Sequence, residues 1–350
     1  MGVILAVVKN VGGTNAVLPV MDLLKEKHHI HWIAQEDGRG KEVLKSIGQN
    51  FGLGPASAEI YRDSVSAIIS STCSTVGRDL ARFFKDYCPI IVIQDQWTAG
   101  LYDVWTYPEY RPDYILVNDK LDKSLVLKAW PDFNANHVKV TGYPAVDKYV
   151  NFDIQSAKTR VKNTLSLIKN KPIVLFAGQW RETGHAITEL VRALNEIEHN
   201  IYLIARPHPA MKDNSPTEVP LWDKALAGFY SGTLISDSLS CSISDIIASS
   251  DLVLSMYSTA LNEAAILRIP NIAILYPGHG SRLYTDVTKL EEYPMVSLGC
   301  TAKARNYEEL VRLIKIALTS DIGLRQAQEK TFQLDGKNAL RAAEFISSLI

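Results

Sequence analysis

Short apolar runs alternate with longer amphipathic stretches along the whole chain of 350 residues. The runs are rich in Val, Ile and Leu and predict buried β-strands at 3–8, 30–34, 66–69, 90–94, 114–117, 137–140, 173–177, 201–205, 233–235, 252–254, 271–275 and 295–298. Helical spacing of apolar residues predicts helices at 15–27, 76–87, 184–198, 258–268 and 306–319. This alternation predicts an α/β protein with parallel sheets that are covered by helices on both faces.

The alternation pauses at 141–156, where a Gly-Tyr-Pro turn follows one expected strand and the next helix has not begun. A chain of this length exceeds the size at which one core usually stops growing. We therefore expect two Rossmann-like, doubly wound domains at 1–145 and 150–325, and a C-terminal helix at 326–350 that returns to the first domain. Ligands of such sheets bind beyond the carboxyl ends of the strands, so two domains that face one another would form a cleft lined by these loops.

Charge and cysteine content narrow the classes of function. Lys+Arg 37 against Asp+Glu 38 give no support for broad electrostatic binding of nucleic acid or anionic membrane. The four cysteines are widely spaced, without a nearby pair, so neither a disulfide framework nor a structural metal is expected. We find no signal peptide and no apolar stretch near the ~20 residues that span a bilayer. A cytoplasmic protein is expected, with peripheral attachment to the inner membrane face left open.

Two loops that follow expected strands in the first half carry candidate site residues. Gly12, Gly13 and Thr14 lie before a helix, where glycines let a ligand approach the backbone and the helix start offers N–H groups. A tight turn with its own capping side chain explains the same residues. The Glu-Asp-Gly segment at 36–38 follows the second strand, and Asp37 could accept a proton from an attacking hydroxyl or cap the next helix. Both interpretations stay open.

The loop at 95–112 is unusually long and aromatic for a connection. It could line a substrate cleft, or it could fold back as a packed surface loop. In the second half, Gly178 and Gln179 stand between a strand and a helix, where the backbone could contact a phosphate.

The segment ARPHP at 205–209 ends an apolar run with two cationic or polar side chains between prolines. Because the prolines restrict the backbone, Arg206 and His208 have few directions in which to point. A guanidinium and an imidazole together suit a phosphate or diphosphate. A purely structural histidine is the alternative.

The segment at 251–270 predicts a strand, a hydroxyl-rich turn, a helix and a proline that opens the next strand. Ser258 and Thr259 at the helix start can cap the helix and present hydroxyls and amides to a phosphate. Glu263 lies about one turn further and could accept hydrogen bonds from a ribose. The alternative is a well-capped helix whose glutamate stabilises its own first turns.

Together these residues resemble the GT-B superfamily of glycosyltransferases. The segment SSDLVLSMYSTALNEAAILRIPNIAIL is similar to the donor-nucleotide segment shared by GT-B transferases, CDP-glycerol glycerophosphotransferases and UDP-N-acetylglucosamine 2-epimerases. His208-Pro209 and Ser258-Thr259 resemble the HP and S/T motifs of bacterial sialyltransferases and capsule enzymes. The segment 36–38 matches the order of their D/E-D/E-G motif, which supplies the general base.

The resemblance implies a metal-independent, inverting glycosyltransferase without a cofactor. It would move a sugar from a nucleotide-activated donor, with a CMP-linked acidic sugar preferred, to a hydroxyl of a glycan or glycolipid acceptor. Asp37 would be the base, with Asp95 as the second candidate, and Glu263 would position the ribose. The leaving phosphate would be held by Arg206, His208, Ser258 and Thr259. The alternatives are a UDP-N-acetylglucosamine 2-epimerase, a transferase of CDP-linked polyol phosphate, and a non-enzymatic two-domain binding protein.

Overall fold

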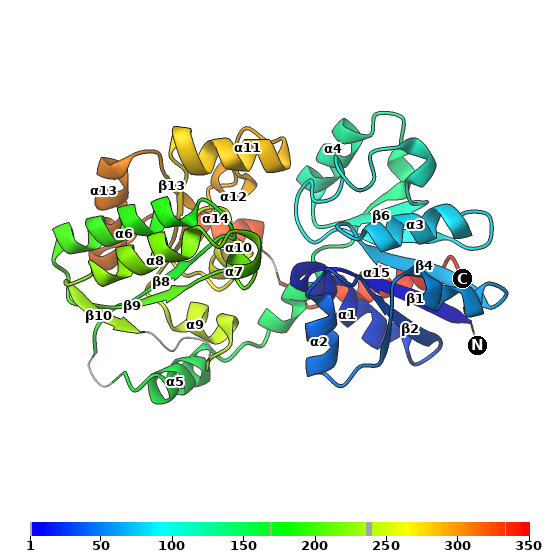
Figure 1. Ribbon diagram of the computed structural model, residues 1–350, viewed down its shortest axis with the longest axis horizontal. Helices are drawn as coiled ribbons and strands as arrows, with labels where there is room; N and C mark the ends of the chain where they lie inside the picture. The colour runs from blue at the N-terminus through cyan, green and yellow to red at the C-terminus, as the bar shows by residue number, and fades with distance from the viewer. Residues whose placement is uncertain (1, 168–169, 236–239, 333) are drawn as a thin grey trace. The chain divides into compact units, whose positions relative to one another are not determined.

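The computed structural model describes residues 2–167, 170–235, 240–332 and 334–350. The chain divides into two compact units, which we call unit 1 (Met1–Val150 with Leu334–Ile350) and unit 2 (Asn151–Gln333). Each unit is built on one parallel β-sheet with helices on its faces (Figure 1). The expected α/β class with two parallel sheets is confirmed.

The sheet of unit 1 has the strand order β3-β2-β1-β4-β5-β6-β7, and every pair of neighbours is parallel. Its strands are β1 (Val3–Val8), β2 (His29–Ala34), β3 (Phe51–Leu53), β4 (Val65–Ser71), β5 (Ile90–Ile93), β6 (Tyr114–Val117) and β7 (Val138–Val140). The chain starts in the middle of the sheet, moves to one edge and then returns to build the other. The strand order therefore reverses between β1 and β4, which is the usual place for a ligand in a doubly wound sheet.

Helices cover both faces of this sheet, and each face has its own apolar core. The helical segments are α1 (Val11–Leu24), α2 (Gly40–Ser46), η1 (Pro55–Tyr61), α3 (Thr75–Phe84), η2 (Pro108–Tyr110), α4 (Lys120–Ala129), η3 (Ala135–His137), η4 (Pro144–Tyr149) and α15 (Asn338–Ser347). The loop at 95–112 buries Leu101 and Trp105 in the core, and the Trp105 indole donates to the Thr72 carbonyl at 2.8 Å. This part of the loop is therefore packed into unit 1.

The C-terminal helix α15 packs on α1 and η4 within unit 1. Its Ala342 and Ile346 are fully buried in the same core as Ala16 and Val20 of α1. Asp147 of η4 fixes the start of α15, because its carboxylate accepts hydrogen bonds from the Asn338 amide (3.2 Å), the Asn338 side chain (2.7 Å) and the Ala339 amide (2.8 Å). These amides have no partner within the helix, so the carboxylate serves as the helix cap.

The sheet of unit 2 has the strand order β10-β9-β8-β11-β12-β13, again with parallel neighbours. Its strands are β8 (Ile173–Ala177), β9 (Ile201–Arg206), β10 (Gly232–Ile235), β11 (Leu252–Ser255), β12 (Asn271–Ile274) and β13 (Ala302–Ala304). Its helical segments are α5 (Ile154–Thr164), α6 (Thr183–Ile197), α7 (Met211–Asn214), α8 (Glu218–Ala227), α9 (Ile243–Ser249), α10 (Thr259–Ile266), η5 (Pro277–Ser281), α11 (Arg282–Thr288), α12 (Pro294–Ser297), α13 (Tyr307–Thr319) and α14 (Arg325–Thr331). Within the described ranges, no helix of either unit is both long and apolar enough to cross a membrane.

One expected strand is wrong. The apolar run at 295–298 forms the short helix α12 (Pro294–Ser297), and the last strand of unit 2 is β13 (Ala302–Ala304). A proline at the first helical position favours a helix, and a short apolar run cannot be assigned from its periodicity alone. Every other expected strand overlaps an observed one, while β3 (Phe51–Leu53) was not expected.

Replacing Asp147 with asparagine should loosen α15. The variant puts an amide NH₂ group where a carboxylate oxygen now accepts backbone N–H groups, so the free energy of unfolding should fall by about 1–3 kcal/mol. Denaturant titration of Asp147→Asn measures this loss. Asp86→Asn, which changes an exposed carboxylate of unit 1, is the matched control. Equal stability of the two variants would contradict the capping role of Asp147.

Candidate functional site

The carboxyl edge of the unit 2 sheet brings the predicted donor-binding loops together. Strand order reverses between β8 and β11, and β9 lies on the other side of β8. The Ser255 hydroxyl at the end of β11 donates to the Ala177 carbonyl at 2.5 Å, and the Gly178 amide donates to the Arg206 carbonyl at 2.9 Å. These two bonds fix the ends of β9, β8 and β11 side by side, so the loops after them share one edge.

Arg206 ends β9 at this edge and His208 lies two residues further, and both are half-buried. The Arg206 guanidinium donates from Nη1 to the Cys241 carbonyl at 2.9 Å. Burial lowers the pKa of Arg206 from its ordinary value, yet an arginine remains charged at neutral pH. The Ala210 amide donates to Nδ1 of His208 at 3.1 Å, which assigns the proton of the neutral ring to Nε2. The N–H group of the neutral His208 ring therefore lies on the side of Nε2.

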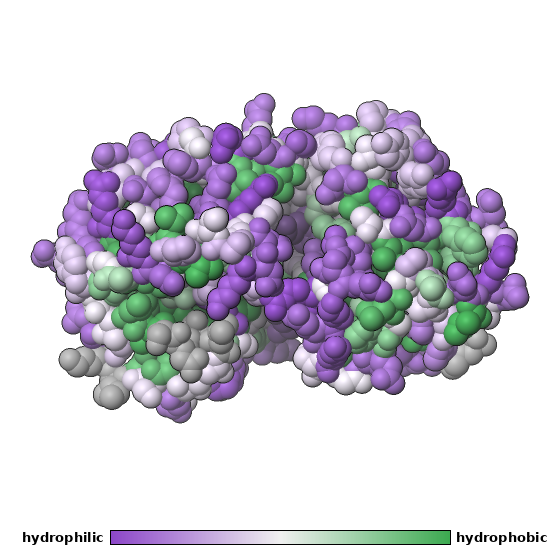
Figure 2. All heavy atoms as spheres, in the orientation of Figure 1, coloured by the Kyte–Doolittle hydropathy of each residue, from purple (hydrophilic) through white to green (hydrophobic). Residues whose placement is uncertain are grey.

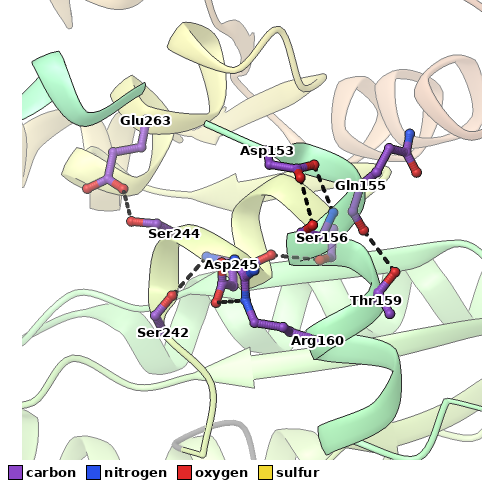
Figure 3. Close-up of polar contacts among 10 residues, drawn as sticks. Asp153, Gln155, Ser156, Thr159, Arg160, Ser242, Ser244, Asp245 and Glu263 are labelled. Atoms are coloured by element: carbon purple, nitrogen blue, oxygen red, sulfur yellow. Dashed lines mark hydrogen bonds and ion pairs between the residues drawn. The ribbon is translucent and has the colours of Figure 1, made fainter. Parts of the chain in front are cut away.

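Ser258 and Thr259 begin α10, next to the end of β11. Ser258 is the N-cap, and its hydroxyl oxygen accepts the Ala260 amide at 3.2 Å. Glu263, one turn further, accepts a hydrogen bond from the Ser244 hydroxyl at 3.2 Å. Figure 3 shows the Ser244 and Glu263 side chains pointing toward one another from α9 and α10. The capping alternative for Ser258 is thus confirmed as a structural role, while phosphate binding stays a prediction.

The start of α9 connects the two predicted groups of residues. Arg206 contacts the carbonyl of Cys241, the residue before the N-cap of α9, and Glu263 contacts Ser244 in the first turn of the same helix. The helix is held in place by an ion pair between Arg160 and Asp245, with contacts of 2.6 and 3.2 Å (Figure 3). Arg206 and Glu263 are therefore positioned by one helix start, although they are far apart in the sequence.

The glycine after β8 is required by packing. A Cβ atom on Gly178 would lie 2.6 Å from the Trp222 ring, which fills the space that the glycine leaves. Gln179 is buried, and its backbone N–H group donates to the Thr183 hydroxyl at 3.3 Å. These contacts explain both residues without a ligand, so their predicted role in phosphate binding stays a prediction.

The N-terminus of α6 already holds a carboxylate from the protein itself. The amides of Glu182 and Gly184 donate to the Glu218 carboxylate at 2.9 and 2.6 Å. A negative charge at this position satisfies the first N–H groups of the helix and its dipole. Of the helices that follow β8 and β11, α10 therefore has the N-terminus that a ligand phosphate could approach.

Sequence reasoning missed a group of polar side chains near the start of α6. The rings of His185 and His279 stack with centroids 3.8 Å apart, and burial together with the neighbouring His279 lowers the pKa of His185. Several buried polar atoms here lack a hydrogen-bond partner among the residues that the structure describes: Arg181 Nε, Glu182 Oε2, His185 Nε2, Tyr257 Oη and Tyr276 Oη. They come from the ends of β8, β11 and β12, so no local sequence pattern could have grouped them.

In unit 1, Gly12 and Gly13 do not form a loop before the helix, as the sequence suggested. They belong to the first turn of α1, whose N-cap is Asn10, and the Gly13 amide donates to the Asn10 side chain at 2.7 Å. A Cβ atom on Gly12 would lie 2.9 Å from Asp95 Oδ2, so the close approach of this carboxylate requires a glycine. Thr14 is fully buried, and its hydroxyl donates to the Asn10 carbonyl at 2.7 Å.

Asp37 does not cap a helix. The next helix, α2, has Arg39 at its N-cap and no side-chain cap. Instead, Asp37 accepts a hydrogen bond from the Gln35 amide group at 2.7 Å and lies 3.7 Å from the Lys9 ammonium, with its side chain 69% exposed. The structure therefore excludes the capping alternative and leaves a solvent-accessible carboxylate at the end of β2.

Asp95, the second candidate for the base, has the opposite environment. It is buried at the end of β5 against Gly12, and its Oδ1 accepts the Thr72 hydroxyl at 3.1 Å. Burial raises the pKa of the Asp95 carboxyl. Asp37 and Asp95 thus present the same chemical group in an exposed and in a buried form.

A further set of buried polar groups lies beyond β4, β5 and β6, near Asp95. Asp122 is fully buried in the first turn of α4, and its Oδ2 accepts the Asn118 amide at 3.0 Å. Burial raises the pKa of the Asp122 carboxyl to about 8, and the nearby carboxylates of Asp119 and Asp95 add to the shift. Four buried atoms here have no partner within the described part of the chain: Ser71 Oγ, Gln94 Oε1, Asn118 Oδ1 and Asp122 Oδ1.

The buried Asp122 should make the stability of unit 1 depend on pH. Its carboxyl keeps its proton up to about pH 8 when folded, whereas an unfolded chain releases it near pH 4. Unfolding therefore releases a proton between these values, so the free energy of unfolding falls as the pH rises from about 4 to about 8. Asp122→Asn removes this pH dependence and keeps a side-chain oxygen that can accept the Asn118 backbone N–H group.

Denaturant titrations at several pH values test this expectation. The stability of Asp122→Asn relative to the wild type should increase steadily between pH 5 and pH 8, by at most about 1.4 kcal/mol per pH unit. The free energy of unfolding of the exposed-site control Asp86→Asn should change with pH as that of the wild type does. If the free energy of unfolding of Asp122→Asn also follows the wild type at every pH, Asp122 does not hold its proton in the folded state.

Comparisons with known proteins place the chain in a family. The family described as CDP-Glycerol:Poly(glycerophosphate) glycerophosphotransferase matches residues 97–346. This range contains every candidate residue of unit 2, while Gly12, Asp37 and Asp95 of unit 1 precede it. None of the curated proteins matches the sequence.

Solved structures share the fold at low sequence identity. The wall teichoic acid polymerase TagF has a TM-score of 0.62 and 16% identity, with 98% of this chain and 88% of that chain covered. UDP-GlcNAc 2-epimerase from Neisseria meningitidis, bound to UDP-GlcNAc, has a TM-score of 0.71 and 14% identity, with 99% and 100% covered. MurG from Acinetobacter baumannii has a TM-score of 0.63 and 12% identity, with 99% and 100% covered.

These likenesses confirm the GT-B fold that the sequence predicted. The family match extends over well more than half of the 350 residues. The protein therefore belongs to the CDP-glycerol:poly(glycerophosphate) glycerophosphotransferase family, and it is a transferase of the GT-B type.

Proposed function

We propose that the protein transfers a polyol phosphate, glycerol phosphate in the first instance, from a CDP-linked donor to a hydroxyl of a glycan or polymer acceptor. The family description supports this choice of donor and transferred group. The observation that carries the proposal is the carboxyl edge of unit 2. There Arg206 ends β9, His208 lies two residues further, and the N-terminus of α10 follows β11.

In this proposal the donor diphosphate lies over the ends of β9, β8 and β11. Arg206 and His208 donate hydrogen bonds to it. The first amides of α10 and the Ser258 hydroxyl complete the set, because a helix N-terminus favours an anion. Glu263, held by Ser244 at 3.2 Å, accepts a ribose hydroxyl.

The transfer is a displacement at phosphorus. The acceptor oxygen forms a bond to the β-phosphorus while the bond from that phosphorus to the bridging oxygen breaks, and CMP leaves with the electron pair. The acceptor proton passes to a carboxylate of unit 1. Cationic side chains and helix amides stabilise the charge that develops on CMP, so the proposal requires no metal ion and no cofactor.

Asp37 is the proposed base. Its carboxylate is exposed and oriented by Gln35 at 2.7 Å, so an acceptor can reach it from solvent. Asp95 remains the second candidate, since its raised pKa would make it the stronger base, but its Oδ2 faces Gly12. The proposal places the reaction in the cytoplasm.

Transfer of a sugar from a CMP-linked acidic sugar is the second candidate function. The exposed carboxylates of the segment 36–38 at the end of β2 favour it, because they match the motif that sialyltransferases use for the base. The same edge of unit 2 would hold the CMP leaving group. The attack would then occur at the anomeric carbon and invert it.

Cytidine nucleotides should stabilise the folded protein. CDP at about 100 times its Kd should stabilise it by about 2.7 kcal/mol, which a rise in Tm measures. His208→Ala removes one phosphate donor and should weaken CDP binding at least tenfold. His199→Ala, at the amino end of β9, is the matched control and should bind CDP like the wild type.

The outcomes separate the candidates. Absence of any Tm shift with CDP, CMP, UDP and GDP would overturn the proposed donor class. Release of CMP from CDP-glycerol, measured with an acceptor present, supports polyol phosphate transfer. Release of CMP from a CMP-linked sugar alone moves the assignment to the second candidate.

Asp37→Asn should abolish turnover while leaving the Kd for CDP nearly unchanged. The amide cannot accept the acceptor proton, whereas the donor site is built from unit 2 alone. Single-turnover rates with CDP-glycerol measure the loss, and Asp95→Asn is assayed beside it. Full activity of Asp37→Asn together with loss of activity in Asp95→Asn would transfer the role of base to Asp95.

A further inference from the structure

The face of α6 that lies between α8 and α13 forms the floor of a groove. Val191, Arg192, Asn195 and Glu196 follow the helical spacing that puts side chains on one face. With residues of α8, all four line a cavity of about 650 Å³. Arg192 and Glu196 also line a second cavity of about 600 Å³, together with residues of α13. Each volume lies in the range of sites that hold small molecules.

Three residues join the two cavities into one groove. The Arg192 guanidinium stacks on the Tyr307 ring at 3.8 Å from its centroid, and the Tyr307 hydroxyl donates to Glu196 at 2.6 Å. Arg192, Glu196 and Tyr307 line both cavities. Burial and the Glu196 carboxylate raise the pKa of Tyr307 to about 12, so the phenol keeps the proton that it donates.

The groove is cationic, although the whole chain has a formal net charge of -1. Lys224 lines the first cavity, Arg312 and Lys315 line the second, and Arg192 lines both. The acidic lining residues are Glu196 and Glu308, and Glu196 already accepts the Tyr307 hydroxyl. Figure 2 shows mainly hydrophilic side chains on the surface around α6 and α13.

Apolar side chains stand exposed beside these cations. Tyr230 is 75% exposed and Leu221 is 50% exposed, and both line the first cavity. A ligand that covers them must carry apolar spacers as well as negative charges. A compact nucleotide would occupy one cavity, whereas two adjoining cavities with cations in each suit an extended molecule.

We propose that this groove binds a linear anionic polymer of phosphodiester-linked polyols. The phosphates pair with Lys224, Arg192, Arg312 and Lys315, and the polyol spacers pack against Tyr230 and Leu221. None of these residues belongs to the strand-end loops of the proposed donor site. Only the identity of the polymer rests on the proposed function. The groove would retain the growing acceptor polymer between successive transfers.

Fluorescence anisotropy with fluorescein-labelled poly(glycerol phosphate) tests the groove directly, without turnover. The triple variant Lys224→Glu, Arg312→Glu and Lys315→Glu should bind the polymer at least tenfold more weakly than the wild type. The control variant Lys158→Glu, Lys162→Glu and Lys330→Glu makes the same charge change elsewhere on unit 2. The affinity of this control for the polymer should stay within twofold of that of the wild type. Added salt should weaken the binding of the polymer to the wild type.

Equal binding by the wild type and the groove variant would overturn the proposal, and so would equally tight wild-type binding of uncharged dextran. The CDP-induced Tm shift of the groove variant shows that it is folded and that its donor site is intact. If the triple variant unfolds, Lys315→Glu alone should still weaken binding about threefold. Absence of CDP binding in the wild type would count against the proposed function, whereas polymer binding tests the groove alone.

Discussion

The arrangement of loops at the carboxyl edge of the unit 2 sheet depends on the hydrogen bonds of the last peptide of β8, between Ala177 and Gly178. This peptide is buried in the middle of the unit 2 sheet, and a buried backbone group without a partner is costly. The Ala177 carbonyl receives the Ser255 hydroxyl, and the Gly178 amide reaches the Arg206 carbonyl. These two hydrogen bonds hold the ends of β9 and β11 beside the end of β8. This constraint brings the loop after β9 and the helix start after β11 to the same edge of the sheet.

The sequence predicted the layers of both units well because buried parallel strands leave a plain local signal. Runs such as Val3–Val8 are apolar on both faces and rich in β-branched residues, which favours a buried parallel strand. The run at 295–298 failed because four apolar residues after a proline serve a buried helix equally well. The prediction for Gly12 and Gly13 was wrong for a different reason: the close packing of Asp95 against Gly12 in α1 is invisible in the local sequence.

The candidate site was predictable as a set of loops but not as a set of contacts. Proline-flanked Arg206 and His208, and the hydroxyls before α10, carry local signals of a strand end and a helix cap. Their connection through α9 depends on where Cys241 and Ser244 lie after folding. The stacked pair of His185 and His279 depends on two strands that are distant in the chain. Such pairings are made by the sheet, so they become visible only with the tertiary structure.

The discontinuity of unit 1 affects the order in which the protein can be completed during synthesis. The apolar face of α1 around Ala16 and Val20 is covered by α15, which the ribosome makes only after all of unit 2. Unit 2 can therefore finish folding while unit 1 still exposes part of its core, because domains generally fold as they emerge.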